Sequence, residues 1–123
     1  DLAGHEQDSN RYRRVLENVD RWIPRILERL GSEGVLFVAA DHGNDPMLGT
    51  SRHTREYVPI LVAGQAIGPL ELGTRTSLSD IAATIAELLG AAPVPAGRSF
   101  ARLLGPVSAH ALETRETAPS MMS

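Results

Sequence analysis

The feature that most constrains the fold is a pair of short apolar runs on either side of a polar loop. The first run is VLFVAA, residues 35–40, and the second is YVPILVA, residues 57–63. Each has the length and composition of a strand that is buried on both faces, as in a parallel sheet. Pro59 stands near the start of the second run, where a missing backbone N–H is tolerated. We therefore expect two neighbouring buried strands.

A helical pattern precedes the first run. From about Ser9 to Leu30, apolar residues recur every three or four positions with charged residues between them. This spacing predicts an amphipathic helix, and Gly31 is a suitable residue to end it. Pro24 lies inside the pattern and removes one hydrogen-bond donor, so we expect a kink there or two abutting helices.

The second half of the chain predicts another helix over residues 77–89, SLSDIAATIAELL. Ser77 and Asp80 have the spacing of a capping box at its start. The segment 98–105 predicts a short closing helix. The apolar face expected for the 77–89 helix consists of Ile81, Ile85, Leu88 and Leu89.

The order helix, strand, loop, strand, helix predicts an α/β fold with a layered, largely parallel sheet flanked by helices. We assign residues 1–105 to part of one core domain. Residues 106–123 lose the apolar periodicity, so we expect a mobile tail that includes His110.

Composition excludes several kinds of protein. The 123 residues contain no cysteine, which rules out disulfides and thiolate metal sites and favours a cytoplasmic location. A formal net charge of −3 gives no reason to expect nucleic acid or an anionic membrane as partner. No apolar run approaches the ~18 residues that a membrane-spanning helix needs, so we expect no membrane segment.

The polar loop carries the candidate chemistry. Asp41 and His42 come directly after the first apolar run, and Gly43 lets the chain turn. In open α/β sheets, ligands bind outside the carboxyl ends of strands. His53 stands just before the second run and can return to the same place. Carboxylate and imidazole groups are good ligands for Zn²⁺ or Mn²⁺.

Asp1 and His5 add two further candidate ligands at a four-residue spacing, which can place both side chains on one side of a turn. Five such ligands exceed what one tetrahedral ion needs, and with one more they suit two ions about 3.5–4 Å apart, as in phosphoryl transfer. The competing interpretation of the Asp41–His42 pair is a turn cap beside a solvated imidazole. Asp45, next to Pro46, is expected to be a turn residue.

Specific strings in this region resemble a known family. ADHGNDP followed by SRHTREYVPILV, then LGTRTSLSDIAATIAELLG (72–90) and GRSF (97–100), are similar to the C-terminal part of phosphopentomutases. These enzymes belong to the alkaline phosphatase-like metalloenzyme superfamily, which also holds the cofactor-independent phosphoglycerate mutases. The resemblance covers roughly residues 1–104 and implies an alkaline phosphatase-like core domain.

The resemblance implies roles for particular residues. Asp41 and His42 match the Asp-His pair of one metal site, and His53 matches the histidine of the other. Asp1 and His5 match the partners of His53, although phosphopentomutases usually space that Asp and His by five residues rather than four. Phosphoglycerate mutases and alkaline phosphatases use the spacing of four. Arg55 is a candidate for binding a substrate phosphate.

The resemblance also implies what the whole enzyme does. It would use two divalent ions, with Mn²⁺ expected and Zn²⁺ or Mg²⁺ as alternatives, to interconvert pentose 1-phosphate and 5-phosphate. The family's nucleophilic Thr and a further metal-binding Asp would precede Asp1, so we expect no catalytic nucleophile in this chain and no activity from it alone.

Two other classes of function stay open at this point. One is a phosphoglycerate mutase-like, phosphatase or phosphodiesterase activity on the same scaffold. The other is a non-catalytic binding module, since a truncated sheet exposes apolar surface that favours self-association.

Overall fold

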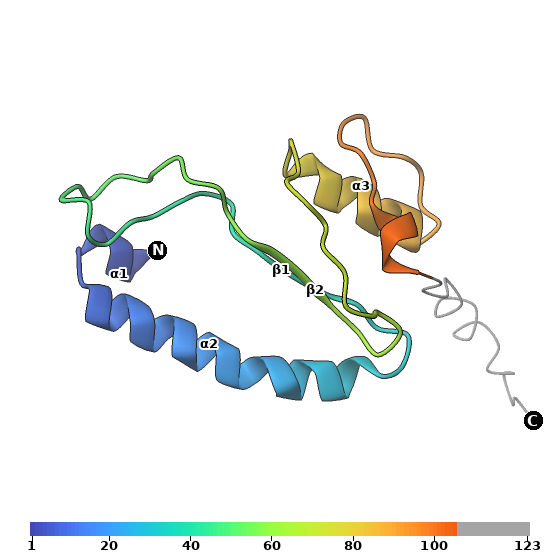
Figure 1. Cartoon of the computed structure of the whole chain (residues 1–123), viewed down its shortest axis with the longest axis horizontal. Helices are drawn as coiled ribbons and strands as arrows, with labels where there is room; N and C mark the ends of the chain where they lie inside the picture. The colour runs from blue at the N-terminus through green and yellow to red at the C-terminus, as the bar shows by residue number, and fades with distance from the viewer. Residues whose placement is uncertain (106–123) are drawn as a thin grey trace, which may run out of the picture. The chain divides into compact units, whose positions relative to one another are not determined.

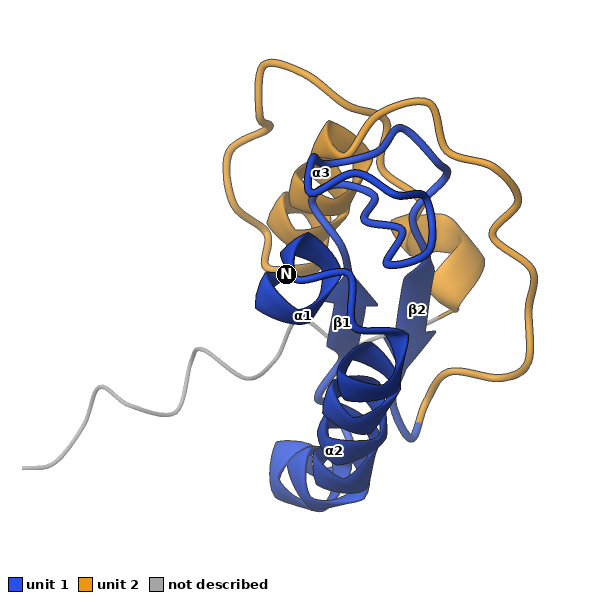
Figure 2. Cartoon of the chain, turned by 90° about the vertical axis from the view of Figure 1, so that its left-hand side faces the viewer, with its two compact units in different colours: residues 1–65 blue, residues 66–123 orange. Residues whose placement is uncertain are grey.

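The computed structural model describes residues 1–105 and divides at Gln65 into two compact units (Figures 1 and 2). The first unit holds the helices α1 (Leu2–His5) and α2 (Ser9–Leu30) and the strands β1 (Leu36–Ala39) and β2 (Ile60–Ala63). The second holds α3 (Ser79–Leu88) and the 3₁₀ helix η1 (Ala101–Leu104). The tail predicted for residues 106–123, with His110, lies outside the described residues.

Helix α2 confirms the helix predicted from Ser9 to Leu30. The Asp8 carboxylate caps its start by accepting a hydrogen bond from the Arg11 backbone N–H at 2.8 Å. Gly31 ends it with a backbone φ of 69°, which glycine adopts without steric cost. Pro24 lies inside one continuous helix, so the alternative of two abutting helices is wrong.

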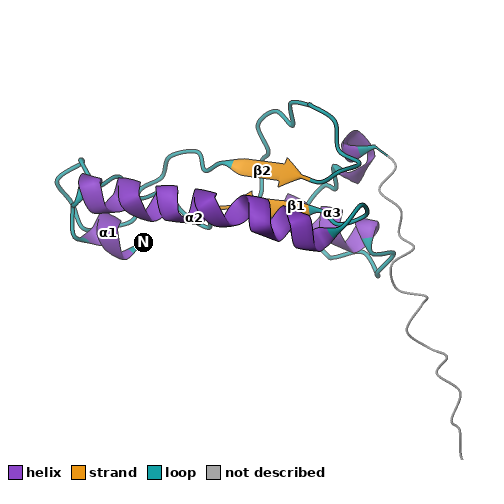
Figure 3. Ribbon diagram, turned by 90° about the horizontal axis from the view of Figure 1, so that it is seen from below, coloured by secondary structure: helices purple, strands orange, loops and turns teal. Residues whose placement is uncertain are grey.

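The apolar face of α2 is only partly covered. The helix contacts β1 and α1 (Figure 3), yet within the described chain none of its side chains is fully buried. Leu16 and Trp22 are both more than half exposed. The buried residues of this unit are instead Ala3 and Gly4 of α1. No helix in the described range 1–105 has both the length and the apolar character that crossing a membrane requires.

The two strands pair antiparallel, which corrects the prediction of a largely parallel sheet. Leu36 lies opposite Ala63, and Ala39 lies opposite Ile60. The prediction fails for this pair because a parallel connection returns the chain to the starting end of the sheet, usually through a helix. Residues 40–59 contain no helix and simply reverse the chain direction.

Strand burial also differs from the prediction of strands buried on both faces. β1 and β2 are mostly half-buried, and Leu61 is 58% exposed. Antiparallel pairing nonetheless places the end of β1 beside the start of β2. An isolated bridge between Gly43 and Thr54 continues this pairing into the loop. Both ends of the loop therefore leave the sheet at the same end of the two strands.

The second unit has its own small core. Phe100, Ala101 and Leu104 are buried, and α3 contacts η1. The Thr84 hydroxyl joins them by donating to the Asp80 carbonyl at 2.6 Å and accepting from the Phe100 backbone N–H at 3.0 Å. The closing helix predicted over 98–105 is thus shorter than expected and has 3₁₀ geometry.

The predicted apolar face of α3 is only partly correct. Ile85 is 38% exposed and Leu89 is 56% exposed, whereas Asp80 and Thr84 are buried. The buried face of α3 combines these two polar residues with Ala86, and residues 97–100 supply backbone partners for both polar side chains. Hydrogen bonding to those partners offsets the cost of burying the carboxylate and the hydroxyl.

Asp80 does not form the predicted capping box. Its carboxylate accepts from the Arg98 backbone N–H at 2.8 Å and from Arg75 Nε at 2.9 Å. Arg75 also donates to the Arg98 carbonyl at 3.0 Å, so the two segments that flank α3 are tied together. The hydrogen bond from Arg98 and the Arg75 guanidinium hold the pKa of Asp80 below its ordinary value, against the opposing effect of burial.

We expect Asp80→Asn to lower the melting temperature at pH 7 by roughly 5 °C or more, since the amide cannot replace a paired carboxylate. Because the pKa of Asp80 is lower in the folded chain, its ionised form stabilises the fold above the ordinary Asp pKa of about 3.9. This contribution is lost as the pH falls through the folded value. Circular dichroism melts from pH 3 to 7 should show the difference from the parent chain shrinking in acid.

The matched control is Asp20→Asn, which changes an exposed carboxylate on α2. It should leave the melting temperature nearly unchanged across the same pH range. An Asp80→Asn chain that melts like this control at pH 7 would contradict the prediction.

Candidate metal centre

Helix α1 places Asp1 and His5 on one side of a single turn. The Asp1 carbonyl accepts from the backbone N–H groups of Gly4 at 2.9 Å and His5 at 3.1 Å. Asp1 Oδ1 then lies 3.0 Å from His5 Nε2. The four-residue spacing in the sequence therefore brings these two side chains together, as predicted.

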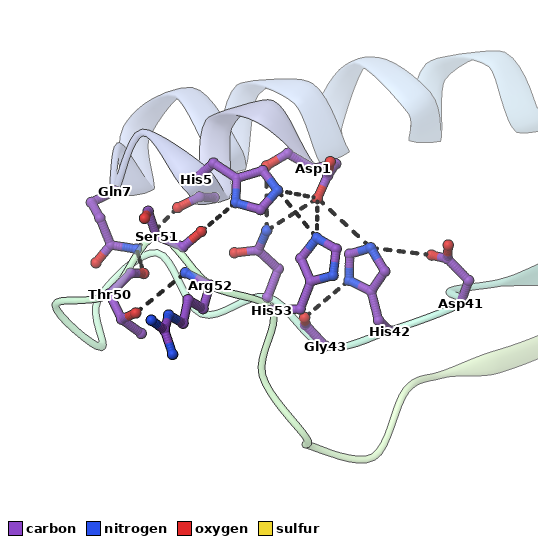
Figure 4. A network of polar contacts seen from close by, with 12 residues as sticks. Asp1, His5, Gln7, Asp41, His42, Gly43, Thr50, Ser51, Arg52 and His53 are labelled. Carbon is purple, nitrogen blue, oxygen red and sulfur yellow. Dashed lines mark hydrogen bonds and ion pairs between the residues drawn. The ribbon is translucent and has the colours of Figure 1, made fainter.

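The loop between the strands brings two more histidines to the same oxygen (Figure 4). His53 Nε2 lies 3.4 Å from Asp1 Oδ1, and His42 Nε2 lies 3.7 Å from it. The His42 and His53 rings are stacked, with 3.5 Å between their centroids. His53 Nε2 also lies 3.2 Å from His5 Nε2. Two chain segments that are far apart in sequence thus contribute to one cluster.

Backbone carbonyls determine which ring nitrogens carry a hydrogen. His5 Nδ1 is 2.5 Å from the Ser51 carbonyl, and His42 Nδ1 is 3.1 Å from the Gly43 carbonyl. Because a carbonyl oxygen can only accept, both Nδ1 atoms must donate. In the neutral rings the Nε2 atoms then hold lone pairs. These lone pairs face the Asp1 carboxylate, a repulsive arrangement unless a proton or a cation lies between them.

The cluster of Asp1, His5 and His53 fits a divalent ion. The three ligand atoms lie within 4.8 Å of one another, and the separations given above are 3.0, 3.2 and 3.4 Å. Two ligands of a tetrahedral Zn²⁺, each about 2.0–2.1 Å from the ion, are about 3.3 Å apart. A carboxylate with two imidazoles, of which His5 is oriented by the Ser51 carbonyl, suits Zn²⁺ or Mn²⁺.

Electrostatics keep His53 in the form that a metal requires. Partial desolvation lowers the pKa of His53, and the neighbouring His42 and His5 rings lower it further. The carboxylate of Asp41 acts in the opposite direction with a smaller effect. The imidazole of His53 is therefore neutral at pH 7, with a nitrogen lone pair available for coordination.

Asp41 takes a different position from the other predicted ligands. Its side chain is 89% exposed, and its Oδ1 lies 3.7 Å from His42 Nε2 (Figure 4). It faces His42 on the side away from Asp1. The ligand atoms of Asp1, His5 and His53 lie closest together, whereas His42 Nε2 lies between this group and Asp41, 3.7 Å from each carboxylate. The ligand roles of all five residues stay a prediction.

The other candidate residues are placed as follows. Arg55 is exposed, and within residues 1–105 it forms no hydrogen bond or ion pair, so its phosphate role stays a prediction. Asp45 is a turn residue as expected, because its carboxylate accepts from the Met47 backbone N–H at 2.8 Å.

Two residues that support the cluster, Asn44 and Gln7, are not among the site residues predicted from the sequence. Asn44 Nδ2 donates to the Asp1 carbonyl at 3.3 Å and to its carboxylate at 3.4 Å. Gly4 leaves room for this contact, since a Cβ there would lie 2.1 Å from Asn44 Oδ1. Gln7 bonds the loop to α1. Asn44 directly follows the Asp-His-Gly string and could have been suspected from it, whereas nothing local to Gln7 indicates a role.

The geometry defines a cluster of carboxylate and imidazole ligands at the edge of a sheet, and the family comparison agrees with it. The family model described as the metalloenzyme superfamily matches residues 1–93. The chain therefore belongs to the metalloenzyme superfamily, which confirms the resemblance seen in its sequence motifs.

Curated relatives that match the chain in sequence include phosphopentomutases. The chain is 48% identical over 101 residues to a phosphopentomutase of Symbiobacterium thermophilum, an alignment that covers 81% of this chain and 26% of the relative. It is 43% identical over 102 residues to that of Alkaliphilus metalliredigens (82% and 26%) and 47% identical over 100 residues to that of Desulfitobacterium hafniense (80% and 26%). The chain thus spans about a quarter of the length of the curated relatives it matches.

We expect the His53 ring to titrate below the ordinary histidine pKa of about 6.5 in the metal-free chain. Since the folded value is the lower one, protonation opposes folding, and stability should fall as the pH drops below about 6.5 until His53 is protonated. His42→Asn removes the ring whose electrostatic effect lowers the pKa of His53, so it should raise that pKa. Proton NMR of the ring resonances measures both, with the urea-unfolded chain as reference. A folded His53 value at or above that reference would contradict the prediction.

Proposed function

We propose that this chain supplies the C-terminal part of the metal site of a phosphopentomutase, an isomerase that interconverts pentose 1-phosphate and 5-phosphate. The observation that carries the proposal is the meeting of Asp1, His5, His42 and His53 around one carboxylate oxygen. The relatives named phosphopentomutase, at 42–48% identity, support the substrate class. Because the chain spans about a quarter of their length, the reaction is proposed for the whole protein.

The proposed ligands divide into two groups. Asp1, His5 and His53 would hold one divalent ion, and Asp41 with His42 would contribute to a second. Bound ions of this kind screen the charge on a transferring phosphoryl group and orient the attacking oxygen. Because His5 Nδ1 and His42 Nδ1 are bonded to the carbonyls of Ser51 and Gly43, Nε2 of each ring would be left to bind the ions.

The remaining proposals concern substrate binding, the activity of the chain alone, the identity of the metal and the cellular location. Arg55 has an exposed guanidinium that can pair with a phosphate oxygen of the substrate. None of the residues we assign is the phosphorylated nucleophile, so we propose that the chain alone is inactive. Mn²⁺ is the proposed metal, with Zn²⁺ or Mg²⁺ as alternatives, and a cytoplasmic location remains a prediction.

Metal binding by the chain tests the ligand assignment directly. Mn²⁺ or Zn²⁺ at about 100 times its dissociation constant stabilises a folded protein by about 2.7 kcal/mol, or roughly 10 °C in melting temperature for a chain of this size. We expect such a shift in a thermal melt of the 123-residue chain. His53→Ala should abolish most of it, while His110→Ala, outside the proposed ligands, should preserve it. An equal shift in both variants, or none in the parent, would refute the assignment.

Product analysis distinguishes the mutase from its alternatives. The full-length protein, incubated with ribose 5-phosphate and Mn²⁺, should yield ribose 1-phosphate and little free phosphate. Release of inorganic phosphate would instead favour the phosphatase or phosphodiesterase reading. Turnover of phosphoglycerate alone would favour the phosphoglycerate mutase reading, with which the four-residue spacing of Asp1 and His5 is consistent.

A non-catalytic role for the chain rests on a different observation. The α2 face that includes Leu16, Val19 and Trp22 is about half exposed, which is unusual for large apolar side chains on one helix. The predicted self-association was assigned to an exposed sheet and stays a prediction, and we propose the α2 face as a second surface for it. It does not compete with the metal site, since these side chains are not among the proposed ligands.

A further inference from the structure

Gln7, between α1 and α2, is one of the residues that connect the loop of the candidate metal centre to α1. Gln7 has a backbone φ of 56°, and it is the one residue other than glycine with a positive φ in the described range 1–105. This left-handed conformation is uncommon for a residue with a Cβ and is best tolerated by Gly and Asn. Gln7 is therefore held in its conformation by what surrounds it.

The amide of Gln7 uses both its donor and its acceptor on backbone groups. Its Nε2 carries two hydrogens and lies within hydrogen-bonding distance of three carbonyls, those of Thr50 at 2.5 Å, Gly4 at 3.0 Å and Asp45 at 3.3 Å, so one hydrogen is shared. Its Oε1 accepts from the Gly49 backbone N–H at 2.8 Å. Gly4 belongs to α1, and the other three belong to the loop, so this one amide joins both parts (Figure 4).

The position of these contacts along the loop matters for the cluster. Thr50 directly precedes Ser51, whose carbonyl accepts from His5 Nδ1. His53 follows two residues later and faces His5 Nε2 at 3.2 Å. Fixing the loop at Gly49 and Thr50 therefore sets where Ser51 and His53 meet His5.

We propose that Gln7 is a positioning residue that holds the loop on α1 and thereby sets the affinity of the Asp1–His5–His53 cluster for a divalent cation. It touches neither the ion nor the substrate in this role. The predicted effect of Gln7 on metal affinity rests on the proposed metal-binding function. The predicted effect of Gln7 on the position of the loop does not depend on a bound metal.

Two substitutions separate this role from general stability. Gln7→Asn keeps an amide and tolerates the left-handed backbone, but it is one methylene too short to make the same contacts. Gln7→Gly removes the side chain and relieves the backbone conformation. We expect both to weaken Mn²⁺ or Zn²⁺ binding at least 10-fold in calorimetric titrations at 20 °C, within the range typical of residues that orient ligands.

The control is Gln65→Asn, which makes the same change at an exposed position. It should leave the dissociation constant within about 2-fold of the parent. Thermal melts of the metal-free variants establish that each is folded at the titration temperature. A lower affinity of a variant that is fully folded at that temperature cannot then be attributed to a loss of global stability.

A metal-free measurement completes the test. In the parent chain, ring protons of His5 and His53 should show a nuclear Overhauser effect, since the ring centroids are 4.9 Å apart. The effect should disappear in Gln7→Asn and Gln7→Gly. Its persistence in both variants, its absence from the parent, or an unchanged affinity in folded variants would each overturn the inference. If the effect is lost as expected but the parent binds no metal, the positioning role stands and the proposed metal function fails.

Discussion

The position of the Asp1 carboxylate among imidazole nitrogens is the constraint that decides what the first unit can bind. Carbonyl partners fix one hydrogen of His5 and of His42 on Nδ1, so in the neutral form of each ring the Nε2 lone pair faces the negative Asp1 oxygen. Such a meeting is unfavourable unless positive charge lies between the groups. Hydrogen bonds from Asn44 and Gln7 hold the loop in place against this repulsion. The fold thus brings the Asp1 carboxylate and the imidazole nitrogens together in an arrangement that a bound cation would stabilise.

Asp80 and Asp1 differ in how the surrounding chain compensates the negative charge of the carboxylate. Asp80 is buried and accepts from a backbone N–H and a guanidinium, so its charge is fully compensated by the chain. Asp1 is half exposed and is surrounded mainly by other acceptors. A compensated carboxylate stabilises the fold, whereas one left among lone pairs is suited to bind something else.

Local patterns in the sequence predicted what depends on local interactions. The α2 helix follows from its apolar spacing and from Gly31, and Asp1, His5, His42 and His53 could be grouped from their motif. The direction of strand pairing could not be predicted, since it depends on how residues 40–59 turn rather than on the strands. The ligand roles themselves rest on motif likeness and await metal-binding data.

Two errors have a common physical origin in contacts between distant parts of the chain. The Ser77–Asp80 spacing is that of a helix cap, but Asp80 bonds instead to Arg98, eighteen residues further on. Gln7 was overlooked because its partners lie about forty residues away in the loop. In both cases the residues next to the side chain in the sequence do not indicate the distant backbone groups to which it bonds.

The separation of His5 and His53 along the chain has a consequence for folding. The two rings meet across 48 positions of sequence. An ion bound by both would act as a cross-link that closes a long ring, much as a disulfide does in proteins that have cysteine. Closing a ring of about 50 residues restricts the unfolded ensemble more than closing a short one, although the dependence on length is only logarithmic. The metal would then provide this cysteine-free chain with a reversible cross-link.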